Sequence, residues 1–341
     1  MKNNIYVGVL GAGSFGTVIA NILAENSPVL LYARRPEVVE EMHATRARGP
    51  YELHEQVIPT NDMEQLADQC QVIFPIVSSS GFRQSIIDIS PFLRPFHILI
   101  HGTKGLDVRQ QTNAPLSREN VRTMSEVIRE ESVVVRVGCL AGPNLARELG
   151  EGQPAATVVA SRFDEVISIG QKLLRTPRFQ VYGNSDLIGI ELSGVLKNVI
   201  AIASGILSGL GMGENARALL ISRGMVEMIY LGKALGGNIE AFIGLAGVGD
   251  LVATCFSRHS RNFTVGYRLA QGENLNQIMQ NMEELAEGVN TTRIVKQLAD
   301  HYQVAAPITR MLYRVLFEDM PAEKALESLM KVPFTEDVSF M

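Results

Sequence analysis

A single lysine stands in an otherwise apolar stretch of small residues. Between Leu192 and Gly213 the only charged residue is Lys197. If residues 192–207 form one helix, the large apolar side chains make a stripe at three- and four-residue spacing, and Lys197 points away from it. Its own face is small and nearly uncharged, so we expect a ligand or a backbone segment to pack closely over it. Desolvation lowers the pKa of such a lysine, as a general acid/base near neutral pH requires. The alternative is a lysine that reaches solvent along its aliphatic stem.

Three glycines near the start of the chain have the spacing of a dinucleotide-binding turn. Gly11, Gly13 and Gly16 follow an apolar run and open a helical pattern over 14–23. In this context Gly11 permits a tight turn and Gly13 lets a pyrophosphate approach the backbone. Gly16 lets helix and strand pack closely, while the helix N-terminus holds the diphosphate. The alternative is a glycine-rich turn that binds no ligand.

The end of the second predicted strand bears on which dinucleotide binds. An acidic residue there would accept hydrogen bonds from the ribose 2′-hydroxyl of NAD. This chain has "LLYARRPE", with Arg34 and Arg35 in that place. Two guanidinium groups suit a 2′-phosphate, so NADP(H) is favoured and NAD(H) remains possible. The alternative is a pair of solvated loop arginines.

Further polar residues follow the fourth and fifth predicted strands. Lys104 lies in "LIHGTKGLD", and Gly142, Pro143 and Asn144 begin "GPNLARELGEG". Ligands bind beyond the carboxyl ends of parallel strands, so all of these are placed to reach one. The alternatives are a surface lysine for Lys104 and a structural turn for Gly142–Asn144, with Asn144 as a helix cap.

The stretch "GLAGVGDLVATCFSRHSRNFTVG" gathers more polar residues behind Gly244, Gly247 and Gly249. An arginine beside an asparagine can hold a phosphate or carboxylate through charge-assisted hydrogen bonds. Cys255 has no evident base, which favours an inert thiol over a nucleophile. The polar candidates are Asp250, Thr254, Ser260, Arg261 and Asn262.

The elements that must position these residues change type along the chain. In the first half, nearly continuous apolar runs alternate with helical patterns, which predicts βαβ units and a doubly wound parallel sheet. After about residue 185 the patterns are helical. We therefore expect a dinucleotide-binding domain over 1–186 and an all-helical substrate-binding and catalytic domain over 187–341. The predicted strands are "IYVGVL", "PVLLYA", "QVIFPIV", "HILIHG", "VVVRVG" and "ATVVAS", and the later helices are "NLNQIMQNMEELAEG", "TTRIVKQLADHY", "ITRMLYRVLFED" and "PAEKALESLMK".

Composition excludes several classes of protein. The 341 residues are 46% hydrophobic and carry a net charge of −5, which argues against a nucleic-acid binder. Three scattered cysteines form neither a disulfide framework nor a metal site, which favours a reducing, cytosolic compartment. The N-terminal run resembles a signal peptide and residues 192–213 a membrane span. The glycine spacing and the polar residues Lys197 and Asn198 argue against both.

These motifs together resemble the bacterial NAD(P)-dependent glycerol-3-phosphate dehydrogenases. The resemblance extends from "GAGSFGT" to "APITRMLYRVL" and depends most on "TKGL", "GVLKNVIAIASGI", "GVGDLVATC", "SRN" and "AEGVNTT". It implies an N-terminal Rossmann-type domain followed by an all-α domain of the 6-phosphogluconate dehydrogenase C-terminal type. It implies reversible reduction of dihydroxyacetone phosphate to sn-glycerol 3-phosphate, for phospholipid synthesis. A cytoplasmic homodimer with no metal and no integral membrane contact is also implied.

The resemblance also implies roles for individual residues. Lys197 is expected to be the general acid/base. The chain departs from the family at "GPNLARE" and "FPIVSSSGFR", so Ser78–Ser80 receive no role. Together with the motifs above, the resemblance implies substrate contacts for Lys104, Gly142, Asn144, Asp250, Thr254, Ser260, Arg261 and Asn262. It implies cofactor contacts for Gly11, Gly13, Ser14, Phe15, Gly16, Arg34, Arg35, Lys104, Ala146, Arg261, Leu285 and Glu287.

Two other functions remain as alternatives. One is another two-domain β-hydroxyacid-type dehydrogenase, such as a 6-phosphogluconate dehydrogenase or ketopantoate reductase relative, which shares the fold and a lysine acid. The other is a catalytically silent NADP-binding protein. Such a protein could lose Lys197, Asp250 and Arg261, and all three are present here.

Overall fold

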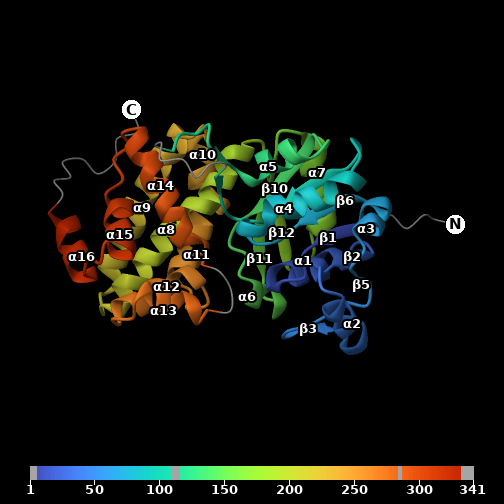
Figure 1. Ribbon diagram of the computed structural model, residues 1–341, viewed down its shortest axis with the longest axis horizontal. Coiled ribbons are helices and arrows are strands. Elements are labelled where there is room, and N and C mark those ends of the chain that lie inside the picture. The colour runs from blue at the N-terminus through green and yellow to red at the C-terminus, as the bar shows by residue number, and fades with distance from the viewer. Residues whose placement is uncertain (1–5, 109–115, 283–285, 332–341) are drawn as a thin grey trace. The chain divides into compact units, whose positions relative to one another are not determined.

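The computed structural model describes residues 6–108, 116–282 and 286–331, and it divides into two compact units (Figure 1). An α/β unit comprises Met1–Asp107 and Arg122–Glu191, and a helical unit comprises Val108–Val121 and Leu192–Met341. The division falls within helix α8 (Leu187–Gly209). The structure thus confirms an α/β fold class with a helical second part.

The α/β unit is built on one eight-stranded sheet (Figure 1). Its strands, from one edge to the other, are β12 (Phe179–Asn184), β11 (Ala155–Ser161), β10 (Arg136–Ala141), β7 (Ile98–His101), β6 (Cys70–Pro75), β1 (Tyr6–Leu10), β2 (Val29–Tyr32) and β5 (Val57–Thr60). The six strands from β10 to β5 are parallel, so their carboxyl ends share one edge of the sheet.

The sheet differs from the sequence prediction in three respects. Strands β5 and β12 were not predicted, and both lie at edges. Strand β5 has only four residues, one of them a proline, and β12 alternates between buried and exposed residues, so neither forms a long apolar run. Strand β10 begins at Arg136, later than "VVVRVG" predicts. Strand β11 is antiparallel to β10, because the link between them holds only a short helix rather than a full crossover.

Helices cover both faces of the sheet, as in a doubly wound fold. One apolar cluster packs α1 (Ser14–Ala24), α2 (Pro36–Thr45), α6 (Ala146–Gly150) and α7 (Asp164–Leu174) against one face. The other packs α3 (Met63–Gln69), α4 (Ser79–Ile89) and α5 (Met124–Glu131) against the opposite face. The remaining elements of this part of the chain are η1 (Ser90–Phe92) and two short strand pairs, β3 (Ala47–Arg48) with β4 (Tyr51–Glu52) and β8 (Asp107–Val108) with β9 (Val121–Arg122).

The helical unit surrounds the long helix α8 (Figure 1). The predicted helix over 274–288 is wrong in extent, because α13 ends at Gln280 with Asn281 as its cap. The other elements are α9 (Glu214–Ala234), α10 (Ile239–Ile243), the π-helical turn η2 (Leu245–Gly249), α11 (Asp250–Phe256), α12 (Arg261–Ala270), α13 (Leu275–Gln280), α14 (Glu287–His301), α15 (Pro307–Phe317) and α16 (Ala322–Met330).

Helix α8 is apolar because it is a core helix. Among the described residues, it is the one helix long and apolar enough to cross a membrane, and 89% of its apolar window is buried within the protein. Its small residues permit backbone contact with α12: a Cβ added at Gly205 would lie 2.0 Å from the carbonyl oxygen of Phe263. One added at Gly266 would lie 1.9 Å from the carbonyl oxygen of Ile202. The small-residue composition therefore follows from close helix packing.

Candidate functional site

Lys197 lies in a buried polar cluster inside the helical unit. Its Nζ donates a hydrogen bond to Asp250 Oδ1 at 2.7 Å and another to the hydroxyl of Thr254. The side chains of Lys197 and Asp250 are 6% and 3% exposed. The Thr254 hydroxyl donates in turn to the backbone carbonyl of Asp250 at 2.6 Å. Three predicted residues, Lys197 from one motif and Asp250 and Thr254 from another, are thus in direct contact.

A backbone segment covers the face of α8 that carries Lys197. The hydroxyl of Ser193 donates to the carbonyl of Ala246 in η2, and that of Ser204 donates to the carbonyl of Cys255 in α11. This is one of the two kinds of cover that the sequence predicted. Lys197 is paired as well as buried, however, because the carboxylate of Asp250 places a negative charge against its ammonium group.

The cysteines do not contribute nucleophiles. All three are buried and free. Burial raises the pKa of Cys255 to about 12, and burial likewise raises that of Cys70 to about 12. A thiol with such a pKa is almost fully protonated at neutral pH and is inert. Among the described residues, no group of His, Cys, Asp and Glu side chains has the arrangement of a metal site.

The start of α12 holds the remaining candidates of the helical unit. Ser260 caps the helix by accepting a hydrogen bond from the N–H of Phe263, and Arg261 is exposed. Asn262 is buried: its amide donates to Asn198 Oδ1 at 3.0 Å and accepts from the N–H of Gly288 at 2.9 Å. Sequence reasoning gave no role to Asn198, whose only signal was its position beside Lys197.

The glycine-rich turn of the α/β unit fits a bound diphosphate. Gly11 has φ +124°, and a Cβ on it would lie 2.3 Å from the carbonyl oxygen of Ile76. A Cβ on Gly16 would lie 1.9 Å from the carbonyl oxygen of Gly11. By contrast, a Cβ on Gly13 would meet nothing within 4 Å. Packing therefore requires glycine at two positions, and the third faces open space at the N-terminus of α1, where Ser14 and Phe15 begin the helix.

Three arginines lie near this turn. Arg34 and Arg35 are exposed and follow the carboxyl end of β2. Sequence reasoning gave no role to Arg48, whose Nε donates a hydrogen bond to the carbonyl of Ala12 at 3.1 Å. No sequence spacing indicated this contact, because β3 reaches the turn only through the fold.

Lys104, Gly142 and Asn144 come together at the carboxyl edge of the sheet. Lys104 Nζ donates to the carbonyl of Gly142 at 3.1 Å. The amide of Asn144 donates to Thr157 Oγ1 at 2.8 Å, so Asn144 is not a helix cap; Leu145 occupies the cap position of α6. The Oδ1 atom of Asn144 is buried and has no hydrogen-bond partner among the described residues. A buried acceptor of this kind is available to a ligand hydroxyl or a water molecule.

The last three predicted contacts are Ala146, Leu285 and Glu287. Ala146 is the first residue of α6, and Glu287 is the first residue of α14. Leu285 lies outside the described residues. The predicted site residues that the structure describes thus divide into two sets, one in each unit.

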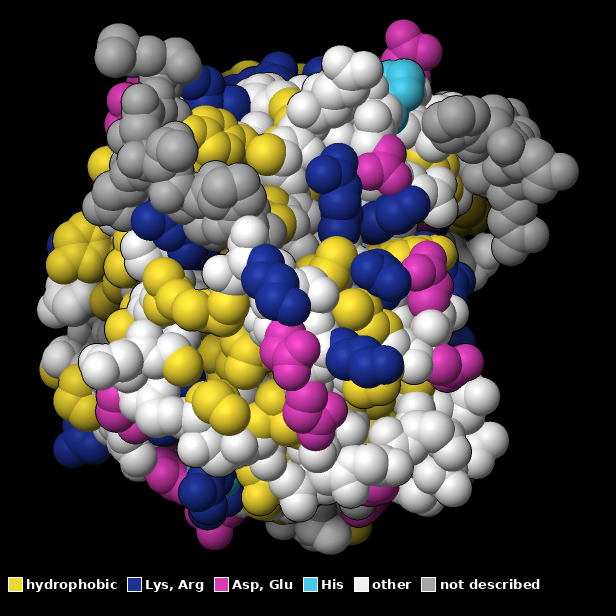
Figure 2. Space-filling model, turned by 90° about the vertical axis from the view of Figure 1, so that its left-hand side faces the viewer, with side chains coloured by type: hydrophobic (Ala, Val, Ile, Leu, Met, Phe, Trp, Pro, Cys, Tyr) yellow, Lys and Arg dark blue, Asp and Glu magenta, His cyan; other side chains and the backbone are white. Residues whose placement is uncertain are grey.

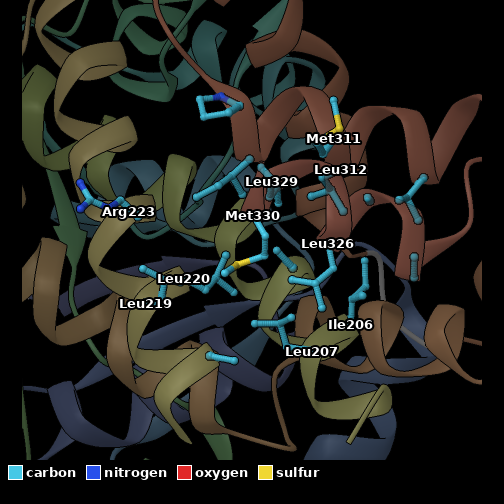
Figure 3. A pocket seen from close by; sticks show the side chains of 17 residues that line it. Ile206, Leu207, Leu219, Leu220, Arg223, Met311, Leu312, Leu326, Leu329 and Met330 are labelled. Carbon is cyan, nitrogen blue, oxygen red and sulfur yellow. The ribbon is translucent and has the colours of Figure 1, made fainter. Parts of the chain in front are cut away.

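An apolar cavity of about 190 Å³ lies elsewhere in the helical unit (Figure 3). Side chains of α8, α9, α15 and α16 line it, and Arg223 lies at its edge. None of the predicted site residues lines it. The face of the molecule drawn in Figure 2 carries apolar side chains among charged ones. Two residues that line the cavity, Leu219 and Met330, are 45% and 65% exposed.

Comparisons with known proteins agree on one family. Residues 6–166 match the model of the NAD-dependent glycerol-3-phosphate dehydrogenase N-terminus, and residues 186–327 match that of its C-terminus. A glycerol-3-phosphate dehydrogenase (NAD(P)+) of Pseudomonas putida is 39% identical over 98% of this chain and 96% of its own. One of Geobacter metallireducens is 41% identical over 95% of this chain and 96% of its own.

Solved structures give the same result. The crystal structure of the Coxiella burnetii glycerol-3-phosphate dehydrogenase is 33% identical, with a TM-score of 0.87 over 96% of this chain and 99% of its own. A ketopantoate reductase of Ralstonia eutropha is 15% identical with a TM-score of 0.56, which shows similarity of fold alone.

Proposed function

This chain belongs to the NAD-dependent glycerol-3-phosphate dehydrogenase family, and we propose that it reduces dihydroxyacetone phosphate to sn-glycerol 3-phosphate. The observation that carries the mechanism is the buried cluster of Lys197, Asp250 and Thr254. A nicotinamide cofactor supplies hydride in this reaction, and the chain supplies orientation, charge and a proton.

Lys197 is the proton donor in this proposal. Reduction of the ketone turns its carbonyl oxygen into a hydroxyl, which needs one proton. The Nζ–H of Lys197 delivers that proton, and in the reverse direction the amine removes it. Asp250 holds the ammonium group in one orientation at 2.7 Å, and Thr254 fixes the same nitrogen from the next turn of α11.

The start of α12 supports binding of the substrate phosphate. Arg261 is an exposed cation there, and the dipole of a helix favours an anion at its N-terminus. Asn262 uses one N–H for Asn198, and an amide has a second N–H to offer. At the sheet edge, Lys104 and the buried Oδ1 of Asn144 suit the carbonyl and hydroxyl groups of a triose.

The α/β unit supports binding of NADP(H) or NAD(H). Gly11, Gly13 and Gly16 make a turn that a diphosphate can approach. Arg34 and Arg35 favour NADPH through its 2′-phosphate, and Arg48 adds a third guanidinium group against the turn.

The test follows the oxidation of NADPH and NADH by their absorbance, with dihydroxyacetone phosphate as substrate. Lys197→Ala should lower kcat by about 10²- to 10⁴-fold, because it removes the proton donor. Binding of NADPH, measured by fluorescence, should stay close to that of the wild type. Lys197→Met with Asp250→Asn removes both buried charges and guards against a loss due to misfolding alone. Full activity of Lys197→Ala would reject the role, and no oxidation by a folded wild type that binds NADPH would reject the substrate.

The cellular setting of the enzyme is also part of the proposal. Val248, Val252 and Phe256 are 39%, 39% and 46% exposed at four-residue spacing along η2 and α11, which supports a homodimer. Light scattering would measure the mass of the assembly.

Buried free thiols suit a reducing cytoplasm, and cell fractionation would test that location. Growth of a strain that requires glycerol 3-phosphate would test supply to phospholipid synthesis.

A further inference from the structure

A buried pair of titratable side chains joins strand β7 to helix α8 within the α/β unit. His101 Nε2 lies 2.9 Å from Glu191 Oε1 and donates its hydrogen bond to that oxygen. Their side chains are 2% and 3% exposed. Neither residue belongs to the site predicted from the sequence, and the mechanism above does not use them.

The start of α5 completes the surroundings of Glu191. The N–H of Ser125 donates to Oε1 at 2.9 Å, and its hydroxyl donates to Oε2. Burial raises the pKa of Glu191, but the hydrogen bonds from His101 and Ser125 outweigh burial and hold that pKa below its usual value. The carboxylate is therefore charged and satisfied by three donors, which makes the arrangement costly to disturb.

The pair stands next to two segments that carry the proposed chemistry. His101 is the last residue of β7, and Lys104 follows it by three residues. Glu191 precedes Lys197 by six residues in α8, about 9 Å along the helix axis. The rings of Phe82 and His101 pack edge to face, with centroids 5.7 Å apart.

We propose that His101 and Glu191 are positioning residues for the reduction. Their hydrogen bond restrains the strand end that leads to Lys104 and the base of the helix that carries Lys197. The kinetic consequence depends on the proposed function, whereas the restraint itself does not. Small misplacements of reacting groups lower rates by as much as about 10²-fold, so a restraint of this kind has a measurable effect.

The experiment compares two variants with a matched control. Glu191→Gln keeps the size of the side chain and removes its charge, and Ser125→Ala removes one hydroxyl donor. The control is His97→Gln. His97 is also buried, directly precedes β7, accepts a hydrogen bond from the N–H of Arg94, and donates one to the carbonyl of Ala67. It tests the same strand at the end remote from Lys104.

Steady-state kinetics with dihydroxyacetone phosphate and NADPH is the first measurement. Glu191→Gln should lower kcat by about 10- to 100-fold and Ser125→Ala by less, with little change in NADPH affinity. His97→Gln should lower the melting temperature and leave kcat within about twofold of the wild type. Hydrogen exchange is the second measurement: Glu191→Gln should accelerate it in residues 101–106 and 187–193.

The proposal fails if Glu191→Gln keeps the wild-type kcat. It also fails if His97→Gln, with the same loss of stability as Glu191→Gln, shows the same fall in kcat. A wild type that does not reduce dihydroxyacetone phosphate overturns the proposed function instead. In that case hydrogen exchange alone tests the restraint. Unchanged exchange in residues 101–106 and 187–193 of Glu191→Gln would reject it.

Discussion

Lys197 and Asp250 form an ion pair in a buried place, and this changes what each residue contributes. Two buried charges lose much of their hydration, and their attraction offsets that loss only while both are present. Removing one partner leaves the other uncompensated, so single variants at these positions are expected to lower stability in addition to affecting the proposed proton transfer. Arg34 and Arg35, which follow β2, have no such constraint because they are exposed. Their effect can be measured on cofactor choice alone.

Replacing Arg34 and Arg35 with alanine should raise the KM for NADPH by about 10- to 100-fold, because charge-assisted hydrogen bonds to the 2′-phosphate are lost. The KM for NADH, which lacks this phosphate, should change little. Arg162→Ala is the control: Arg162 is exposed and also follows a strand, but β11 is antiparallel, so its carboxyl end lies at the opposite edge of the sheet. An equal loss for both cofactors would refute 2′-phosphate recognition.

Helix α8 has three different surroundings along its length. Glu191 at its base contacts β7 and α5, Lys197 faces α11, and Gly205 lies against the backbone of α12. The crossing with α12 brings backbone to backbone, so it has no room for a methyl group on either side. Because Asn262 lies in the first turn of the same helix α12, the crossing also helps to position its amide beside Asn198.

Gly266→Ala should therefore destabilise the protein by about 1–3 kcal/mol, since the new Cβ must displace the backbone of α8. Denaturant unfolding measures the change. The control is Gly81→Ala in α4, where the added Cβ meets only Ser78 Oγ at 3.4 Å. That variant should be unchanged or slightly stabilised, because alanine favours the helix. Equal stability of Gly266→Ala and the wild type would show that α8 and α12 are further apart than described.

The two units have separate cores, and pH acts on the stability of the whole through groups buried in them. In the helical unit, Glu227 of α9 accepts hydrogen bonds from the N–H groups of Ile308 and Thr309 at the start of α15, and from the hydroxyl of Thr309. Burial raises the pKa of Glu227 to about 7, although these donors and the charge of Arg310 oppose the shift. The unfolded chain has the ordinary value near 4.5.

Between these two values the folded protein holds a proton on Glu227 and the unfolded chain does not. The contribution of Glu227 to the free energy of unfolding is therefore complete below about pH 4.5 and is lost as pH rises through about 7. The total change is on the order of 3 kcal/mol. Glu227→Gln cannot titrate, so its free energy of unfolding should fall less than that of the wild type between pH 5 and about 7.5. Urea unfolding at several pH values measures this, with the exposed Glu240→Gln as control. Parallel pH profiles for wild type and Glu227→Gln would contradict the shift.

The sequence by itself determined the residue types and the periodicities. Glycine spacing after an apolar run indicated the turn of Gly11, Gly13 and Gly16, and a lone charge in an apolar helix singled out Lys197, because these signals are local along the chain. The tertiary structure alone decided which distant residues meet. It placed Asp250 and Thr254 against Lys197, Arg48 against Ala12, and Glu191 against His101. It also revealed the edge strands β5 and β12, because β5 is short and the burial of β12 alternates, so that neither makes a long apolar run. Such contacts depend on how elements pack over tens of residues, and no pattern in a short window of sequence encodes that packing.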